Sequence, residues 1–257
     1  MKPSELFDLT GRVAIVTGGG SGIGRQMATG LAEAGASLVL CARKPARCEE
    51  AAGVLERLGV RALGMACDVR DPDQVQHVVE RTKAELGSVD ILVNNAGTSW
   101  GAPAEDHPLE GWQKVIDVNL TGVFLFTQSA GRVMIDQGAG KIVNIASVAA
   151  FGGAPPELMN AVAYNTSKGG VVSFTRDLAT KWARHGINVN AIAPGWFPSD
   201  MNKVLLDAQP DAYLEHIPLR RFGGPDDLKG AVVFLASPAS DYVTGQVVVV
   251  DGGQSAW

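Results

Sequence analysis

A tyrosine and a lysine stand four residues apart in the stretch AYNTSK, as Tyr164 and Lys168. On a helix this spacing places both side chains on one face. A free tyrosine has a pKa of about 10, which is too high for efficient proton exchange near neutral pH. A nearby ammonium favours the phenolate and lowers that pKa. The pair therefore predicts acid–base chemistry, although two residues on an exposed helix face would show the same spacing.

A glycine-rich turn, TGGGSGIG, follows an apolar run near the start of the chain and leads into a helical pattern. Glycine adopts backbone angles that other residues avoid, and its missing side chain lets the backbone approach a pyrophosphate. The helix that follows offers unpaired N–H groups and a positive dipole end to phosphates. Strand, turn and helix together predict a dinucleotide site rather than a plain tight turn. Its expected contacts are Gly18, Ser21, Gly22, Ile23 and Gly24.

The end of the second predicted strand bears on the choice of cofactor. An acidic residue near this point bonds the ribose 2′-hydroxyl in many NAD enzymes. Here Ala42 stands at that place, and Arg43 and Lys44 follow it. Arg43 can bind a 2′-phosphate through two parallel charge-assisted hydrogen bonds. We expect NADP(H) to be favoured over NAD(H); the alternative is a solvated basic turn that opens a helix.

Strand-like and helix-like segments alternate along all 257 residues. The strands read as apolar runs, which is typical of strands covered on both faces. Right-handed connections then predict an α/β fold: one Rossmann-type domain over residues 1–257, with a doubly wound parallel sheet of about seven strands and helices on both faces. The expected strands are 12–17, 37–42, 61–69, 89–97, 140–147, 187–195 and 246–253, and the expected helices are 22–36, 45–58, 72–86, 110–135, 162–185 and 225–236.

The longest irregular stretches are 98–109, 148–161 and 194–224. Each follows the carboxyl end of a predicted strand, which is where open α/β sheets bind ligands. Long loops at such places are commonly functional. We therefore expect these three loops to form the substrate site.

Composition narrows the class of protein. Hydrophobic residues make up 46% of the chain, which is enough for a sizeable core, and the net charge of −5 argues against a nucleic-acid surface or a polybasic membrane patch. No run approaches the roughly 18 apolar residues of a membrane span, and the three cysteines and four histidines lack metal-ligand spacing. We expect a cytoplasmic protein without nucleic-acid, membrane or metal partners.

Five motifs occur in order: the turn TGxxxGxG, the stretch NNAG at 94–97, Asn119, Ser147, and the YxxxK pair. Together they resemble the short-chain dehydrogenase/reductase family, over about residues 8–253. The resemblance implies hydride transfer between a nicotinamide cofactor and a carbonyl or secondary alcohol. Within it, Tyr164 is the general acid or base, and Lys168 lowers the pKa of Tyr164 and holds the nicotinamide ribose. Ser147 bonds the substrate oxygen, and Asn119 holds a water that relays protons from Lys168.

The resemblance also implies contacts with the rest of the cofactor. Asp68 and Val69 are expected at the adenine. Residues after strand four are expected at the adenosine ribose, and residues after strand six at the nicotinamide. These two groups are Asn94, Ala96 and Gly97, and Pro194, Gly195, Phe197 and Ser199.

The expected substrate contacts form an apolar and aromatic set, which suits a hydrophobic carbonyl compound. The set comprises Ser99, Trp100, Leu158, Met159, Trp196 and Met201. Packing of a lid or a subunit contact is the alternative for these residues. The segment from Ser147 to Tyr164 is longer than is usual in the family, which weakens any transfer of substrate from relatives.

The first substrate hypothesis is a 3-oxoacyl compound or similar ketone, because parts of the loops resemble 3-oxoacyl reductases of the rhamnolipid type. The second is a polyol or sugar acid, because the region around Arg43 resembles gluconate 5-dehydrogenases. A non-catalytic sensor is a third hypothesis, against which the complete set of four motif residues argues. The resemblance further implies a homo-oligomer, a dimer or tetramer, with the tail that ends in Trp257 at the contact.

Overall fold

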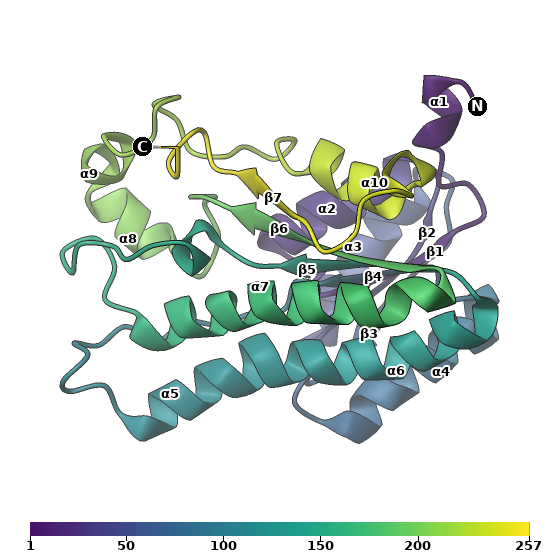
Figure 1. Cartoon of the computed structure of the whole chain (residues 1–257), viewed down its shortest axis with the longest axis horizontal. Helices are drawn as coiled ribbons and strands as arrows, with labels where there is room; N and C mark the ends of the chain where they lie inside the picture. The colour runs from purple at the N-terminus through teal and green to yellow at the C-terminus, as the bar shows by residue number, and fades with distance from the viewer. Residues whose placement is uncertain (257) are drawn as a thin grey trace.

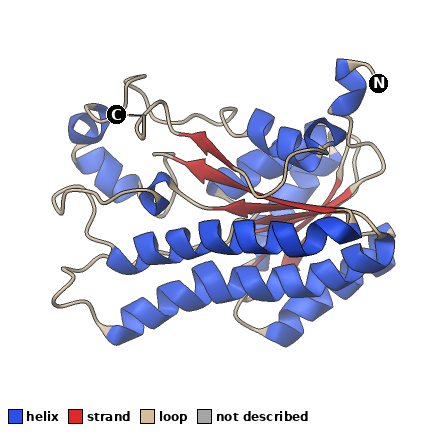
Figure 2. Ribbon diagram, viewed as in Figure 1, coloured by secondary structure: helices blue, strands red, loops and turns tan. Residues whose placement is uncertain are grey.

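The chain folds around one parallel sheet of seven strands in the order β3-β2-β1-β4-β5-β6-β7 (Figures 1 and 2). The computed structural model describes residues 1–256, so the prediction for Trp257 lies outside the described residues. The sheet confirms the predicted doubly wound α/β fold. Its strands are β1 (Val13–Thr17), β2 (Ser37–Ala42), β3 (Ala62–Ala66), β4 (Ile91–Asn94), β5 (Gly140–Ile145), β6 (Ile187–Pro194) and β7 (Val247–Val250).

Helices cover both faces of this sheet, and each layer encloses its own apolar core (Figure 1). Helices α2 (Gly22–Glu33), α3 (Pro45–Glu56) and α10 (Lys229–Ala236) pack on one face. Helices α4 (Pro72–Leu86), α6 (Gly122–Gln137) and α7 (Val162–Trp182) pack on the other. All five residues of β1 are buried, because a strand between two helical layers meets no water on either side.

The helical segments differ from the predicted ones in four places. The expected helix 110–135 is α5 (Leu109–Ile116) and α6 joined by a π-helical turn at Asp117–Thr121. Two short helices, α8 (Lys203–Ala208) and α9 (Pro210–Leu214), lie within the loop 194–224, and α1 (Pro3–Leu6) precedes the first strand. Helix α10 begins four residues late, because Asp227 accepts from the Gly224 backbone and pairs with Arg221 in the preceding turn.

The strand order determines where a ligand can enter. Strand β1 pairs with β2 on one side and with β4 on the other, so the chain runs outward from this point in both directions. The loops that follow β1 and β4 therefore separate at the carboxyl edge of the sheet and leave a crevice there. Among residues 1–256, no helix is long and apolar enough to cross a bilayer.

Candidate active site

The glycine-rich turn sits at this crevice, and its glycines are needed for close contacts. Gly18 has φ of +66°, and a β-carbon on it would lie 2.9 Å from Asn95 Nδ2. A β-carbon on Gly24 would lie 2.4 Å from the Gly18 carbonyl oxygen. Asn95 Nδ2 donates to the Thr17 carbonyl oxygen at 2.8 Å, so the loop after β4 fixes the turn. Helix α2 begins at Gly22, which directs its first N–H groups towards the turn.

Arg43, which is predicted to bind the 2′-phosphate, lies beside the glycine-rich turn. Strand β2 ends at Ala42, and the exposed Arg43 and Lys44 lead into α3. Asp68 is nearby on the loop after β3, where Arg70 Nη2 holds its carboxylate at 2.6 Å. This hydrogen bond is the main cause of a lowered pKa of Asp68, so the carboxylate stays charged and paired.

The segment after β6 folds over the same turn. A β-carbon on Gly22 would lie 3.5 Å from Ser199 Cβ. Next along the chain, Asp200 Oδ2 pairs with Arg47 Nη1 of α3 at 2.5 Å. Gly195 donates its N–H to the Val250 carbonyl oxygen at 3.0 Å, which continues the pairing of β6 and β7 beyond Pro194. Residues 195–200 thus cross from the sheet to the opening of α3.

Phe197, expected at the cofactor, lies elsewhere. It is only 5% exposed and belongs to the apolar core of the α2 and α3 face. Its ring packs on Gly223, where a β-carbon would come within 2.2 Å of it. Because an aromatic ring gains most from full burial, the side chain turns inward and leaves the cofactor crevice to its neighbours.

Asn94 also differs from its expected position. Its side chain is 2% exposed and donates from Nδ2 to Thr127 Oγ1 and to Asn144 Oδ1, both at 2.9 Å. The amide therefore ties β4 to β5 and α6 inside the core, because a buried amide needs partners there. Its side chain does not face the crevice. Val69 is buried too, against Gly122 of α6.

Tyr164, Ser147 and Lys168 come together at the carboxyl end of β5, and the YxxxK spacing accounts for Tyr164 and Lys168. Ser147 follows β5, and α7 carries Tyr164 and Lys168 past it. Both hydroxyl-bearing residues line one cavity. Burial raises the pKa of Tyr164, and a hydrogen bond with Ser147 acts in the opposite direction.

Lys168 is buried, and no carboxylate among residues 1–256 pairs with it. The side chain is 4% exposed, and Nζ donates to the Ile145 carbonyl oxygen at 2.7 Å. Burial lowers the pKa of Lys168 to about 8. Its Nζ lies 5.6 Å from the centre of the Tyr164 ring. Burial is the largest cause of the shift in the pKa of Tyr164 and raises it, so the lowering expected from a nearby ammonium is not found.

Asn119 lies in the π-helical turn and is fully buried. Its Oδ1 accepts from the Thr98 N–H at 2.8 Å, and Nδ2 donates to the Thr98 carbonyl oxygen and to Ser167 Oγ. A β-carbon on Gly97 would lie 3.5 Å from Asn119 Oδ1 and 3.9 Å from Lys168 Nζ. The amide thus holds the loop after β4 against α7, next to the lysine.

The cavity beside Tyr164 has a volume of about 660 Å³. Five of the six predicted substrate residues line it: Ser99, Leu158, Met159, Trp196 and Met201. Trp100 does not, because its ring packs on Gly111 of α5 and lies 5.1 Å from Lys114 Nζ. Phe151 and Leu205, which lie in two of the predicted substrate loops, also line the cavity, whereas sequence reasoning missed Asn165 and Gln254. Of these two, Asn165 lies within the YxxxK motif and could have been predicted.

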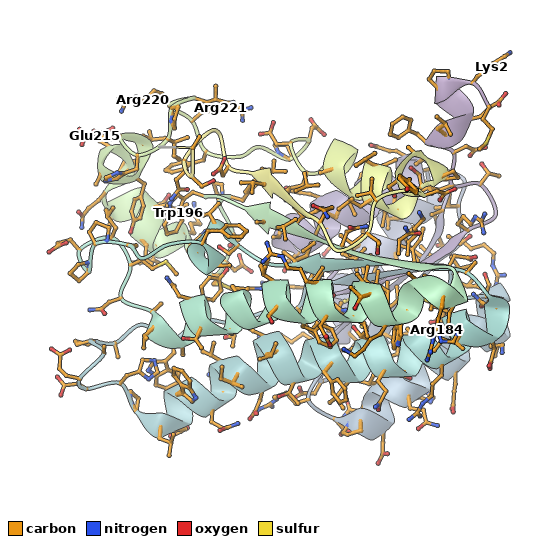
Figure 3. The ribbon with its side chains drawn as sticks, in the orientation of Figure 1. Lys2, Arg184, Trp196, Glu215, Arg220 and Arg221 are labelled. Carbon is orange, nitrogen blue, oxygen red and sulfur yellow. The ribbon has the colours of Figure 1, made fainter. Side chains whose placement is uncertain are left out.

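Trp196 connects two of the predicted substrate loops. In Figure 3 it lies between the carboxyl end of the sheet and the helices α8 and α9. Its ring meets that of Tyr213 edge-on, with 4.7 Å between centroids. The Tyr213 hydroxyl donates to the Leu158 carbonyl oxygen at 3.0 Å, which joins α9 to the loop 148–161. The wall of the cavity is therefore one packed unit rather than two separate loops.

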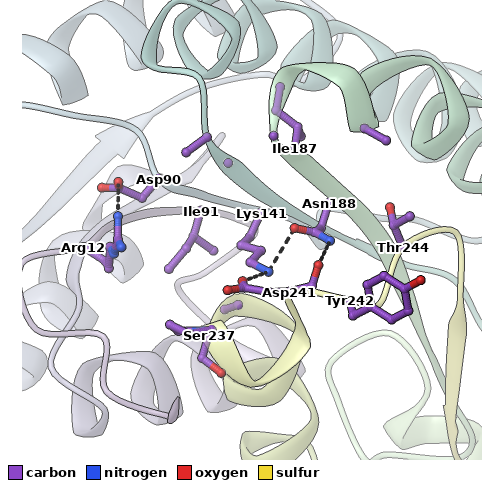
Figure 4. A pocket seen from close by; sticks show the side chains of 16 residues that line it. Arg12, Asp90, Ile91, Lys141, Ile187, Asn188, Ser237, Asp241, Tyr242 and Thr244 are labelled. Atoms are coloured by element: carbon purple, nitrogen blue, oxygen red, sulfur yellow. Dashed lines mark hydrogen bonds and ion pairs between the residues drawn. The ribbon is translucent and has the colours of Figure 1, made fainter. Parts of the chain in front are cut away.

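A second cavity, of about 680 Å³, opens at the amino end of the sheet (Figure 4). Its charged groups pair with each other: Lys141 Nζ contacts Asp241 Oδ1 at 2.8 Å and Asn188 Oδ1 at 3.0 Å. Arg12 faces Asp90 across 3.3 Å. Neither the turn nor the YxxxK pair is near, so the chemistry belongs to the first cavity.

Comparison with known proteins fits this geometry. The family model described as "Enoyl-(Acyl carrier protein) reductase" matches residues 18–255. The chain belongs to the short-chain dehydrogenase/reductase family. It is therefore an oxidoreductase of that type, with homologues named as dehydrogenases and reductases.

Two curated relatives illustrate its place in the family. The chain is 43% identical to 2-dehydro-3-deoxy-D-gluconate 5-dehydrogenase of Escherichia coli, with 97% of each chain covered. It is 39% identical to gluconate 5-dehydrogenase of Gluconobacter oxydans, with 98% of each covered.

Solved structures agree with the relatives. Gluconate 5-dehydrogenase of Burkholderia cenocepacia, solved with NADP and tartrate, matches with a TM-score of 0.93 and 39% identity over 99% of each chain. The RhlG/NADP complex of Pseudomonas aeruginosa matches with a TM-score of 0.92 and 36% identity, over 98% of this chain and 99% of that one.

Proposed function

We propose that this enzyme interconverts a ketone and a secondary alcohol on a small polyhydroxylated compound, using NADP(H). One observation carries the proposal: the hydroxyl groups of Ser147 and Tyr164 line a single cavity, and the buried Lys168 lies 5.6 Å from the tyrosine ring. When bound, the nicotinamide supplies or accepts the hydride.

The protein's own groups handle the proton and the oxygen. Tyr164 donates its phenolic proton to the carbonyl oxygen during reduction and takes it back during oxidation. Ser147 donates a hydrogen bond to the same oxygen as negative charge develops on it. Lys168 orients the nicotinamide ribose and favours the phenolate. Asn119 holds the loop after β4 in place, and we propose that it also anchors a water that relays protons from Lys168.

The residues around the crevice fit a dinucleotide with a 2′-phosphate. A β-carbon at Gly18 or Gly24 would collide with Asn95 or with the Gly18 carbonyl, so only glycine allows the turn to pack this closely at the start of α2, where backbone N–H groups can hold a pyrophosphate. No acid follows β2, and Arg43 and Lys44 are exposed at the matching place. Several similar structures were solved with NADP bound, which supports the same choice. Ser21, Ile23, Ala96, Gly97, Pro194, Gly195 and Ser199 complete the proposed contacts.

The relatives' names favour a sugar-derived substrate over the 3-oxoacyl compound of our first hypothesis. A 3-oxoacyl compound is the second candidate substrate, because Phe151, Leu158, Met159 and Leu205 give the cavity apolar walls.

For assembly we propose a cytoplasmic homodimer or homotetramer. The outer edge of β7 has no partner strand within residues 1–256, and Val249 on it is 41% exposed.

A cofactor comparison tests the proposal. Replacement of Arg43 by alanine removes charge-assisted bonds to a 2′-phosphate, so we expect kcat/KM with NADPH to fall by about 10- to 100-fold. The value with NADH should change little, because NADH lacks that phosphate. Arg57→Ala, on the far end of α3, is the matched control. An equal loss with both cofactors would refute the role of Arg43, and absence of turnover on every ketone tried would refute the proposed function.

A further inference from the structure

The side chains around the substrate cavity carry one sign of charge. Within residues 1–256, no lysine, arginine or histidine lines the cavity, and Glu157 is its one charged side chain. The buried Lys168 lies beside Tyr164 but is not among the residues that line the cavity, and its Nζ donates to the Ile145 carbonyl oxygen. On the loop 194–224, Arg221 pairs with Asp227, and Arg220 donates to the Leu214 carbonyl oxygen. Figure 3 shows both arginines at the outer edge of the molecule. A carboxylate placed in this cavity would therefore lose water and meet Glu157 without gaining a cation.

Two amide groups indicate which chemical groups the cavity can bind in place of a carboxylate. Asn165 Oδ1 and Gln254 Oε1 are buried atoms with no hydrogen-bond partner among residues 1–256, and both residues line the cavity. Asn165 Nδ2 donates to the Gly152 carbonyl oxygen at 3.4 Å, which leaves the oxygen for a ligand. Buried oxygens of this kind are costly unless a donor reaches them. With Glu157 they make an acceptor-rich wall.

These observations complement each other. Acceptors call for a ligand with several O–H donors, and the absence of a cation argues against an acid. We propose that the substrate is a neutral polyol or its ketone, held through hydroxyl groups by Asn165 and Gln254, and that sugar acids are poor substrates. This inference rests on the proposed function, and it separates the chain from relatives whose names specify a gluconate.

Matched pairs of alcohols test the charge preference. D-Glucitol and D-gluconate share one carbon chain and differ in a CH2OH or a carboxylate at one end, as do D-mannitol and D-mannonate. With NADP+ we expect kcat/KM for the polyol to exceed that for its acid by about tenfold or more. An equal or higher value for the acid would overturn the inference while leaving the proposed function intact. Turnover of neither member of any pair would instead count against the proposed function.

Variants identify the side chains. Gln254→Met and Asn165→Leu should raise KM for the polyol with little change in kcat or in KM for NADP+, whereas Gln246→Met, outside the cavity, should change none of the three. Glu157→Gln should raise the kcat/KM for the acid relative to the polyol by roughly fivefold at low ionic strength, and Glu110→Gln on α5 should not. Unchanged KM in both amide variants would overturn the proposed hydroxyl contacts.

Discussion

The two ends of the sheet hold cavities of about 660 and 680 Å³. Lys141 lines the cavity at the amino end, and Lys168 is buried at the carboxyl end, beside the Tyr164 that lines the other cavity. Burial lowers the pKa of Lys168 at the carboxyl end and of Lys141 at the amino end. Lys141 has Asp241 at 2.8 Å, which opposes that shift. Within residues 1–256, Lys168 has only the Ile145 carbonyl oxygen as a hydrogen-bond acceptor.

The difference lies in the partner rather than in the residue type or the size of the cavity. A paired lysine at the start of β5 contributes to folding, since its charge is already compensated. A buried lysine without a carboxylate keeps its charge available to a ligand, at some cost in stability. Cavity size alone does not distinguish the two ends of this molecule.

The largest expected effect comes from removing one tyrosine hydroxyl at the carboxyl end of the sheet, compared with removing one at the amino end. Tyr164→Phe removes the proposed proton donor, so we expect kcat for ketone reduction to fall by about 10³-fold. NADPH binding, measured by the change in cofactor fluorescence, should stay the same. Tyr242→Phe, at the fully exposed tyrosine of the amino-end cavity, is the matched control and should retain full activity. Substantial turnover in Tyr164→Phe would refute the assigned proton donor.

The next effect comes from the pKa of Lys168. Because that pKa is about 8, the side chain is charged below pH 8 and neutral above it. Burial raises the pKa of Tyr164, so the tyrosine keeps its proton in this range. We expect kcat/KM for reduction, followed from pH 6 to 10, to fall above pH 8 by up to about tenfold per pH unit.

The source of this alkaline fall can be assigned by substitution. Arginine keeps its charge at every pH in the range. Lys168→Arg should therefore abolish the fall, whatever activity it retains, while Lys141→Arg should leave the profile as it is. A fall near pH 8 that persists in Lys168→Arg would show that another group titrates there.

The smallest effect is on stability. Lys141→Met deprives Asn188 and Asp241 of their shared donor, so the free energy of unfolding should drop by about 1 kcal/mol and the Tm by about 2–4 °C. Steady-state activity should not change, because the amino-end cavity takes no part in the reaction. Calorimetry and a rate assay on the same sample check both statements. A stable variant that loses activity would contradict the division between the two ends.

The sheet and the main site were predictable because both leave local signals. Apolar runs mark the strands, and the spacing of Tyr164 and Lys168 follows from the period of one helix. The residues whose positions were predicted wrongly are those whose neighbours come from distant segments. Trp100 turns to Gly111, Phe197 to Gly223, and Asn94 to Asn144, and nothing near any of them in the chain indicates those partners. Gln254 reaches the cavity only because β7 pairs with β6.

The walls of the substrate cavity come from Ser99 onward, whereas the glycine turn and the strand ending at Ala42 precede it. The glycine turn and the substrate cavity are thus separate along the gene as well as in the fold. Recombination in the short loop after β4, at 95–97, would exchange nearly all of the proposed substrate-binding residues in one event while preserving the proposed 2′-phosphate site. Descendants of such a recombinant can gain activity on new alcohol substrates while they keep the same cofactor.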